Sequence, residues 1–265
     1  MSTTVKQAAL SIGLNYGSCH RQMRLNGCQN DSNNVVNYLK NERGYDAAYI
    51  RQSLDKSRYD YATSRVGIIE SIIKLAVNSW RHNMEEIFIH YSGHGTQVDD
   101  YDNNEEDGKD EALVPWDFAQ NGMILDDKLN DLLQEVNPST RVICVFDCCH
   151  SGTLCDLPFR YDVVKNDGSV VESSVFGGKS TPTKVIALSG CKDAQVSMDA
   201  YNVGGRGQYS GAMSSCLLQV LRSSSGKKWT VKELLPALHM ELNRRGFAQK
   251  PVITSSVKIH DEYLF

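Results

Sequence analysis

The sequence predicts an α/β fold in which a mostly parallel central sheet has helices on both faces. Segments 86–91, 141–146 and 184–188 are short runs of mainly apolar, often β-branched residues, as in strands that are buried on both sides. Segments with helical periodicity alternate with these runs. Such alternation favours a parallel sheet that is covered by helices.

The remaining elements follow from the same patterns. We predict strands at 7–16, 45–50, 112–116 and 251–259, and helices that begin near Asp31 or Ser32, at Ser64 and near Asp126 or Asp127, with two more at 210–221 and 231–244. The helix after Ser64 has one apolar stripe that should face the core: Val66, Ile69, Ile72, Ile73, Ala76 and Trp80. Segment 97–111 is acidic and 153–183 is rich in Gly, Ser and Asp, so both are predicted loops.

The composition is that of an ordinary globular protein and argues against several functions. The chain has 265 residues, 41% of them hydrophobic and 23% charged, with a formal net charge of −4. This length fits one domain, and no repeat or linker divides it. A mildly acidic balance does not favour nucleic acid or an anionic membrane as partner. The first residues lack the cationic start and long apolar core that are typical of a signal peptide, and no apolar run approaches the ~18 residues of a membrane span, so we expect a cytoplasmic protein.

The eight cysteines are scattered along the chain. No C-x-x-C pair occurs among them, which argues against a disulfide framework and against a zinc site. Most of them are therefore expected to be reduced, packed thiols.

Reactive residues follow two of the predicted buried strands. One strand ends in the sequence VFDCCHSGT, which contains Cys149, and another ends in Ser-Gly-His-Gly, which contains His94. Ligands bind outside the carboxyl ends of parallel strands, so both residues are expected at one edge of the sheet. A thiol with its free pKa of ~8.5 needs a base, and His94 is flanked by small residues that leave its ring accessible. Backbone N–H groups of Gly95 and Cys149 are candidates for an oxyanion hole.

Three other residues near these motifs are not favoured as catalytic residues. His150 adjoins Cys149, but adjacent residues of an extended segment point to opposite sides, which favours a supporting or packing role. His90 lies within a predicted strand and is interpreted as a hydrogen-bonded core histidine. Cys148 is an alternative, less favoured nucleophile.

Two motifs resemble the catalytic motifs of metacaspases, which belong to the caspase-like cysteine peptidases: YSGHG at 91–95 and DCCHSG at 147–152. The similarity extends from about residue 6 to 260 and is closest to type I metacaspases, without their N-terminal prodomain. It implies a caspase-like α/β/α sandwich and a single domain over 1–265, with a large-subunit-like part at about 6–160 and a small-subunit-like part at about 184–260. It also implies that Cys149 is the nucleophile and His94 the base. The caspase signature places its His about 50 residues before the Cys, which is consistent with the spacing here.

The resemblance also implies a specificity pocket. Asp31 and Asp147 match the two acidic residues with which metacaspases select Arg or Lys, and Cys28 and Ser92 match the other walls. Two carboxylates can hold a guanidinium bidentately and would repel an aspartyl side chain. An alternative for Asp31 is a helix N-cap, and for Asp147 a carboxylate that is bonded to local backbone.

Calcium is the cofactor that the resemblance implies. The family's calcium-site aspartates match Asp110, Asp126, Asp127 and Asp156. The acidic segment supplies hard oxygen ligands, but it is not an EF-hand loop, because Asp107 stands where a Gly is required. The alternative is a set of solvated surface acids, with Asp126 or Asp127 capping a helix.

The expected function is that of a monomeric, calcium-activated endopeptidase that cuts protein or peptide substrates after Arg or Lys. Basic residues in its own Gly-rich loops are candidate self-processing sites: Arg160, Lys165, Lys179 and Arg206. The alternatives are a peptide ligase of the same clan and a non-catalytic regulatory or scaffold member of the fold. A thiol-redox protein is disfavoured, because adjacent cysteines form only a strained ring.

Overall fold

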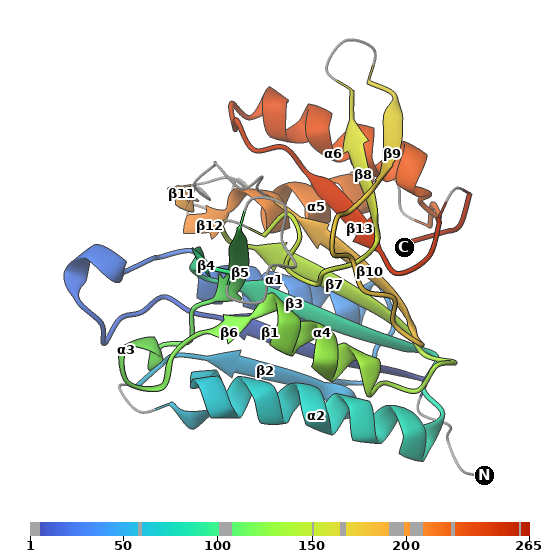
Figure 1. The fold of residues 1–265 in the computed structure, drawn as a ribbon. Coiled ribbons are helices and arrows are strands. Elements are labelled where there is room, and N and C mark those ends of the chain that lie inside the picture. The colour runs from blue at the N-terminus through green and yellow to red at the C-terminus, as the bar shows by residue number, and fades with distance from the viewer. Residues whose placement is uncertain are drawn as a thin grey trace.

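The structure is a computed structural model that describes residues 6–57, 60–100, 108–149, 151–164, 168–190, 199–201, 209–223, 226–259 and 261–265. It shows an α/β/α sandwich around one sheet in the order β2-β1-β3-β7-β10-β13-β8-β9 (Figure 1). Its strands are β1 (Gln7–Gly13), β2 (Ile50–Leu54), β3 (Glu86–Ser92), β7 (Arg141–Asp147), β8 (Phe159–Val163), β9 (Val170–Ser174), β10 (Lys184–Ser189) and β13 (Val252–Ser255). Strands β2, β1, β3, β7 and β10 are parallel, and the other three pair antiparallel. The predicted mostly parallel sheet is confirmed.

Helices cover both faces of this sheet. One apolar core lies between the sheet and helices α2 (Arg65–His82) and α4 (Asp126–Gln134). A second core lies between the other face and helices α1 (Cys28–Asn41), α5 (Ala212–Ser223) and α6 (Val231–Arg244). Short elements complete the fold: α3 (Phe118–Asn121), three 3-10 turns (Arg21–Met23, Ala47–Tyr49, Tyr61–Thr63), and small sheets of β4 (Gly95–Asp99), β5 (Lys109–Leu113) and β6 (Ile124–Leu125), and of β11 (Asp199–Tyr201) and β12 (Tyr209–Gly211). None of the described helices combines the length and the apolar run that a bilayer crossing requires.

Several predicted boundaries were wrong. The strand predicted at 45–50 is β2, which begins only at Ile50, because Asp46 accepts a hydrogen bond from the Ala48 N–H at 2.9 Å and sets a 3-10 turn there. Both predicted loops contain strands. The ends of 97–111 form the β4–β5 hairpin, and 153–183 includes β8 and β9, which extend the sheet (Figure 1). These strands are only partly buried, so they lack the continuous apolar run of a central strand.

The start of α1 corrects one interpretation of Asp31. The helix begins at Cys28 and Gly27 is its N-cap, so neither Asp31 nor Ser32 caps it. Asp31 lies in the first turn and is 1% exposed. Its carboxylate is therefore available for contacts away from its own helix. At α2 the predicted cap is confirmed, since the Ser64 side chain accepts from the Gly67 N–H at 3.1 Å.

Only one border of the predicted apolar stripe of helix α2 is buried. Ile72 and Ala76 of the predicted stripe face the core, whereas Val66, Ile73 and Trp80 are 46%, 43% and 58% exposed. The exposed Trp80 ring donates its N–H to the Glu135 carbonyl at 2.9 Å. The prediction that all six side chains face the core was wrong, because residues 66, 73 and 80 repeat every seven positions and form one border of the stripe, which is turned away from the sheet.

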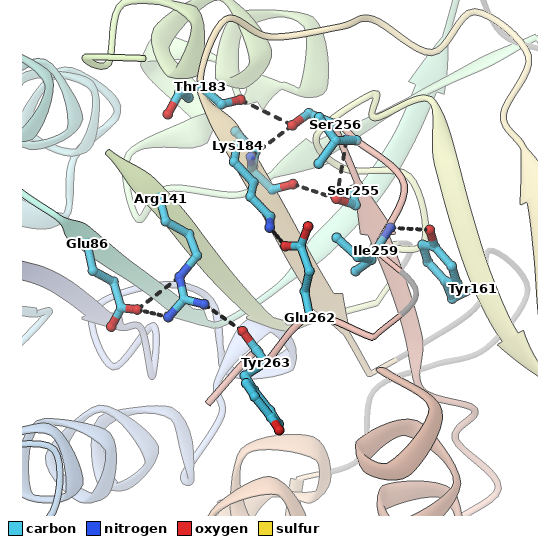
Figure 2. A network of polar contacts seen from close by, with 12 residues as sticks. Glu86, Arg141, Tyr161, Thr183, Lys184, Ser255, Ser256, Ile259, Glu262 and Tyr263 are labelled. Atoms are coloured by element: carbon cyan, nitrogen blue, oxygen red, sulfur yellow. Dashed lines mark hydrogen bonds and ion pairs between the residues drawn. The ribbon is translucent and has the colours of Figure 1, made fainter. Parts of the chain in front are cut away.

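Contacts of charged residues hold the C-terminal segment against the amino ends of the central strands, at the end of the sheet opposite the reactive motifs. Glu86 and Arg141 pair across β3 and β7, and the Arg141 guanidinium also donates to the Tyr263 carbonyl at 2.6 Å (Figure 2). Lys184, at the start of β10, forms an ion pair with Glu262 (Figure 2). The amino ends of three central strands therefore have a structural role, which leaves their carboxyl ends for chemistry.

Candidate active site

The two reactive motifs lie side by side at the carboxyl ends of β3 and β7. These strands are neighbours, with Ser92 opposite Asp147, and the Gly93 N–H donates to the Asp147 carbonyl at 3.4 Å. A Cβ placed on Gly95 would overlap the carbonyl of Cys149 and lie 3.1 Å from the Cys148 sulfur. The segments that carry His94 and Cys149 are thus in backbone contact.

The two adjacent cysteines differ in exposure. Cys148 is 0% exposed and belongs to the core between the sheet and α2, whereas Cys149 is partly exposed. A buried thiol in apolar surroundings is inert, so the exposure favours Cys149 as the reactive thiol. None of the seven cysteines that the structure describes forms a disulfide.

The imidazole of His94 is oriented by two residues that the sequence did not single out. Its Nε2 lies 2.8 Å from the carbonyl oxygen of Met23. A carbonyl only accepts hydrogen bonds, so Nε2 carries the proton and Nδ1 is left to exchange one. The Tyr16 ring lies 4.7 Å from the imidazole between centroids, and the Tyr16 hydroxyl accepts from the His94 backbone N–H at 2.9 Å.

Tyr16 owes its position to an unusual backbone conformation. Its φ is +54°, in the left-handed region, and the Asp55 carboxylate accepts from the N–H groups of Asn15 (2.8 Å) and Tyr16 (2.5 Å). The Tyr16 hydroxyl donates to the Val114 carbonyl at 2.6 Å, and burial raises its pKa well above the usual value. It therefore stays protonated and fixed beneath His94. No sequence signal marks a left-handed tyrosine.

The predicted pocket acids converge on the start of α5. Asp31 accepts from the Ser92 hydroxyl at 2.8 Å and from the Gly211 N–H at 2.9 Å, and Asp147 accepts from the Ser214 N–H at 2.7 Å. A Cβ on Gly211 would contact both carboxylates. Both acids are nearly buried, and the helix N-terminus favours their charged form. Cys28 is also buried and lies three residues before Asp31 on α1, hence on the same face.

Beneath the pocket, His90 is a core histidine, as interpreted from the sequence. Its Nδ1 lies 2.9 Å from the Ser11 hydroxyl and its Nε2 3.1 Å from the Ser214 hydroxyl. Burial lowers the pKa of His90 to about 3, so the ring is neutral. It ties strands β1 and β3 to the residue whose N–H binds Asp147, and therefore helps to position the pocket.

This neutral histidine gives a testable pH dependence. Below pH ~6.5 the unfolded chain binds a proton at His90 that the folded chain refuses until about pH 3, so stability falls as the pH falls through this window. The loss approaches ~1.4 kcal/mol per pH unit. Urea unfolding at pH 7, 6, 5 and 4 should show a shallower slope for His90→Gln than for the parent. Equal slopes would contradict the assignment.

Gly95 has no room for a side chain, because its Cα packs against the Cys149 carbonyl. We expect Gly95→Ala to displace either His94 or Cys149 and to reduce kcat/KM by about 10²-fold, the usual cost of a displacement of ~1 Å. Gly17→Ala is the matched control, since nothing lies within 4 Å of a Cβ placed on Gly17. Peptidase assays on both variants measure the difference, and an active Gly95→Ala protein would refute the close packing.

The predicted calcium ligands are brought together in part. Oxygen atoms of Asp126, Asp127 and Asp156 lie within 4.8 Å of one another, whereas Asp110, buried on β5, is not in this group. Burial, and then the charge of Asp156, raise the pKa of Asp126 to about 9. The Lys179 ammonium binds Asp127 and lies 3.5 Å from Asp156. Burial opposes its charge, but these acids outweigh it and raise the pKa of Lys179. The donor set consists of hard oxygen atoms and already attracts a cation, so it fits Ca²⁺.

The family follows from comparison with known proteins. The family model described as metacaspase, peptidase C14 domain, matches residues 7–158. Curated Metacaspase-1 of Kluyveromyces lactis is 30% identical over 99% of this chain and 69% of its own length, and Metacaspase-1 of Botryotinia fuckeliana is 32% identical over 99% and 70%. The chain belongs to the metacaspase family. This metacaspase is therefore a cysteine peptidase, and it acts on proteins or peptides.

A solved structure has the same fold as this metacaspase. Protein GSU0716 from Geobacter sulfurreducens, known from a crystal structure, superposes with a TM-score of 0.64 and 25% identity over 97% of this chain and 95% of that one. The predicted caspase-like sandwich is confirmed.

The predicted self-processing positions differ in their surroundings. Arg160 lies within β8, between β13 and β9, and forms an ion pair with Asp162 at 2.8 Å. Lys179 follows β9 and lies among the acidic residues described above. Lys165 and Arg206, like His150, lie outside the described residues.

Proposed function

We propose that this metacaspase hydrolyses peptide bonds after Arg or Lys. The observation that carries the proposal is the convergence of Asp31 and Asp147 beside the strand ends that carry His94 and Cys149. Two buried carboxylates beside the start of α5 form an acidic pocket that suits a guanidinium or ammonium group. The Ser92 hydroxyl holds Asp31 in place at 2.8 Å.

The reaction proceeds through a covalent thioester. His94 takes the proton of the Cys149 thiol at Nδ1, and the thiolate attacks the peptide carbonyl. The N–H groups of Gly95 and Cys149 stabilise the oxyanion. The tetrahedral intermediate expels the amine, which takes the proton from His94. His94 then removes a proton from water, hydroxide attacks the thioester, and the Cys149 thiolate leaves with the carboxylic acid released. The Met23 carbonyl keeps the imidazole in the required tautomer throughout.

Calcium is proposed as the activator. Asp126, Asp127 and Asp156 would hold the ion, with Asp110 as a further predicted ligand. A bound Ca²⁺ would supply positive charge to this buried acidic group. It would stabilise the loop that follows β7 and Cys149, because Asp156 lies in that loop and the carbonyl of its neighbour Cys155 accepts from Asn130 of α4 at 2.8 Å.

Hydrolysis of matched fluorogenic peptides that end in Arg or in Asp tests this function, with millimolar Ca²⁺ or with a chelator. We expect release from the Arg peptide alone and stimulation by Ca²⁺. Release from the Asp peptide would refute the pocket, and no release from either would favour the non-catalytic alternative. Product masses separate hydrolysis from ligation, because a ligase would transfer the acyl group to an added amine.

A further inference from the structure

The Lys179 side chain is a cation inside the acidic group of the candidate calcium site. Its ammonium binds Asp127 and lies 3.5 Å from Asp156. The acids belong to α4 and to the loop after β7, whereas Lys179 belongs to the connection between β9 and β10. The contact therefore joins a segment far along the chain to the group that would hold the ion.

Lys179 alone does not satisfy the oxygen atoms of this acidic group. Asp126 and Asp156 are 1% and 2% exposed, and buried carboxylates are costly unless a positive charge accompanies them. Lys179 supplies one positive charge to a group of three acids. Ca²⁺ supplies two and requires six to eight oxygen ligands, so it needs the carboxylate oxygens that the ammonium occupies. The ion and the ammonium therefore compete for the same atoms.

The backbone around Lys179 packs against Asp156 and the residues that follow it. The Lys179 N–H donates to the Asp156 carbonyl at 2.5 Å, and the Val175 N–H donates to the Pro158 carbonyl at 3.0 Å. A Cβ on Gly178 would lie 2.6 Å from the Pro158 Cα. Asp156 itself has φ +47°, a left-handed conformation that its N–H bond to the Thr153 carbonyl (2.6 Å) supports. Movement of Asp156 toward an ion would disturb the docking of segment 175–179.

We propose that Lys179 is a counter-cation of the acidic group Asp126, Asp127 and Asp156, and that a divalent cation displaces its ammonium. The displacement releases segment 175–179 for cleavage after Lys179. This inference rests on the proposed calcium site and on the proposed preference for Lys or Arg. It assigns a reason why self-processing would need calcium. A pocket that binds a lysine side chain cannot take Lys179 while the ammonium is bound to Asp127 and Asp156.

Arg160 provides an internal comparison. Arg160 lies on β8 and is paired in the sheet with Thr254 of β13 on one side and with Ser173 of β9 on the other. Cleavage after Arg160 would require loss of two strand pairings, which a cation at Asp126 does not cause. We therefore expect the cation to expose Lys179 and to leave Arg160 protected.

The first test is calorimetric titration of Ca²⁺ into proteins that carry Cys149→Ala, so that no chain is cut. Three proteins are compared: Lys179 intact, Lys179→Met and Lys179→Arg. Lys179→Met removes the competing charge and should tighten the binding of Ca²⁺ by about tenfold, because the ion no longer has to break the ion pair of Lys179 before it binds. Lys179→Arg keeps the charge and should resemble the parent.

The outcomes separate the inference from the function on which it rests. Tighter binding in Lys179→Met alone supports the inference. Equal or weaker binding in that variant overturns it and leaves the calcium site standing. An absence of Ca²⁺ binding in all three proteins overturns the proposed calcium site together with the inference.

The second test needs no substitution at Lys179. Trypsin also requires a freely accessible lysine, so it reports release of this segment independently of the peptidase's own activity. In the Cys149→Ala protein, Ca²⁺ should accelerate tryptic cleavage after Lys179 at least about fivefold and leave cleavage after Arg160 unchanged, as read by mass spectrometry. A cut after Lys179 that is unaffected or slowed by Ca²⁺ would overturn the inference.

Discussion

Cys149→Ala should lower kcat/KM for an Arg-ending peptide by about 10⁴-fold or more, because removal of the nucleophile of a covalent peptidase leaves only binding and oxyanion stabilisation. The fold should remain intact, since the side chain is partly exposed and the change removes a single sulfur atom. Initial rates with the fluorogenic peptide and a thermal melt measure the two effects separately.

The matched control is the neighbouring cysteine. Cys148 is fully buried, so Cys148→Ala should cost some stability through the lost packing of its sulfur but should retain most of the activity. An inactive, folded Cys148→Ala protein beside an active Cys149→Ala protein would reverse the assignment of the nucleophile.

Asp147→Asn should reduce cleavage after Arg by about 30-fold to several thousand-fold, which corresponds to roughly 2–5 kcal/mol for a desolvated charge pair that loses one partner. Asn has nearly the same shape and keeps an oxygen that can accept from the Ser214 N–H, so the start of α5 should be preserved. The loss is therefore attributable to charge.

A neutral substrate makes this test specific to the pocket. Citrulline has the shape of arginine without its charge, so kcat/KM should be measured for peptides that end in each residue. The parent should strongly prefer Arg over citrulline, and Asp147→Asn should narrow that ratio. A ratio that Asp147→Asn leaves unchanged would mean that Asp147 only caps α5.

The central strands could be predicted from the sequence, and the edges of the sheet could not. Strands β3, β7 and β10 are buried on both faces, so each is a mainly apolar run that can be recognised as a strand from its residue types alone. The β8–β9 hairpin is half exposed and its residues FRYDV and VVESS give no apolar run, so its pairing with β13 depends on tertiary contacts. Helix α2 shows the converse limit, since helical spacing identifies an apolar stripe but not how much of its width faces the core.

The site shows the same division. The motifs place His94 and Cys149 because strand ends fix them. Met23 and Gly211 act through a carbonyl and an N–H, which every residue possesses, so their contacts with His94 and Asp31 could not be predicted from residue type. The contact of Lys179 with Asp127 likewise joins positions 52 residues apart and depends on the docked loop.

The central claim is that Cys149 is the nucleophile beside a pocket for basic residues. The most direct measurement is active-site labelling of the calcium-loaded protein with peptidyl chloromethyl ketones that end in Arg or in Asp, followed by peptide mapping. The account predicts one adduct per chain, on Cys149, formed rapidly with the Arg reagent and very slowly with the Asp reagent. Labelling of Cys148, or equal rates with both reagents, would contradict it.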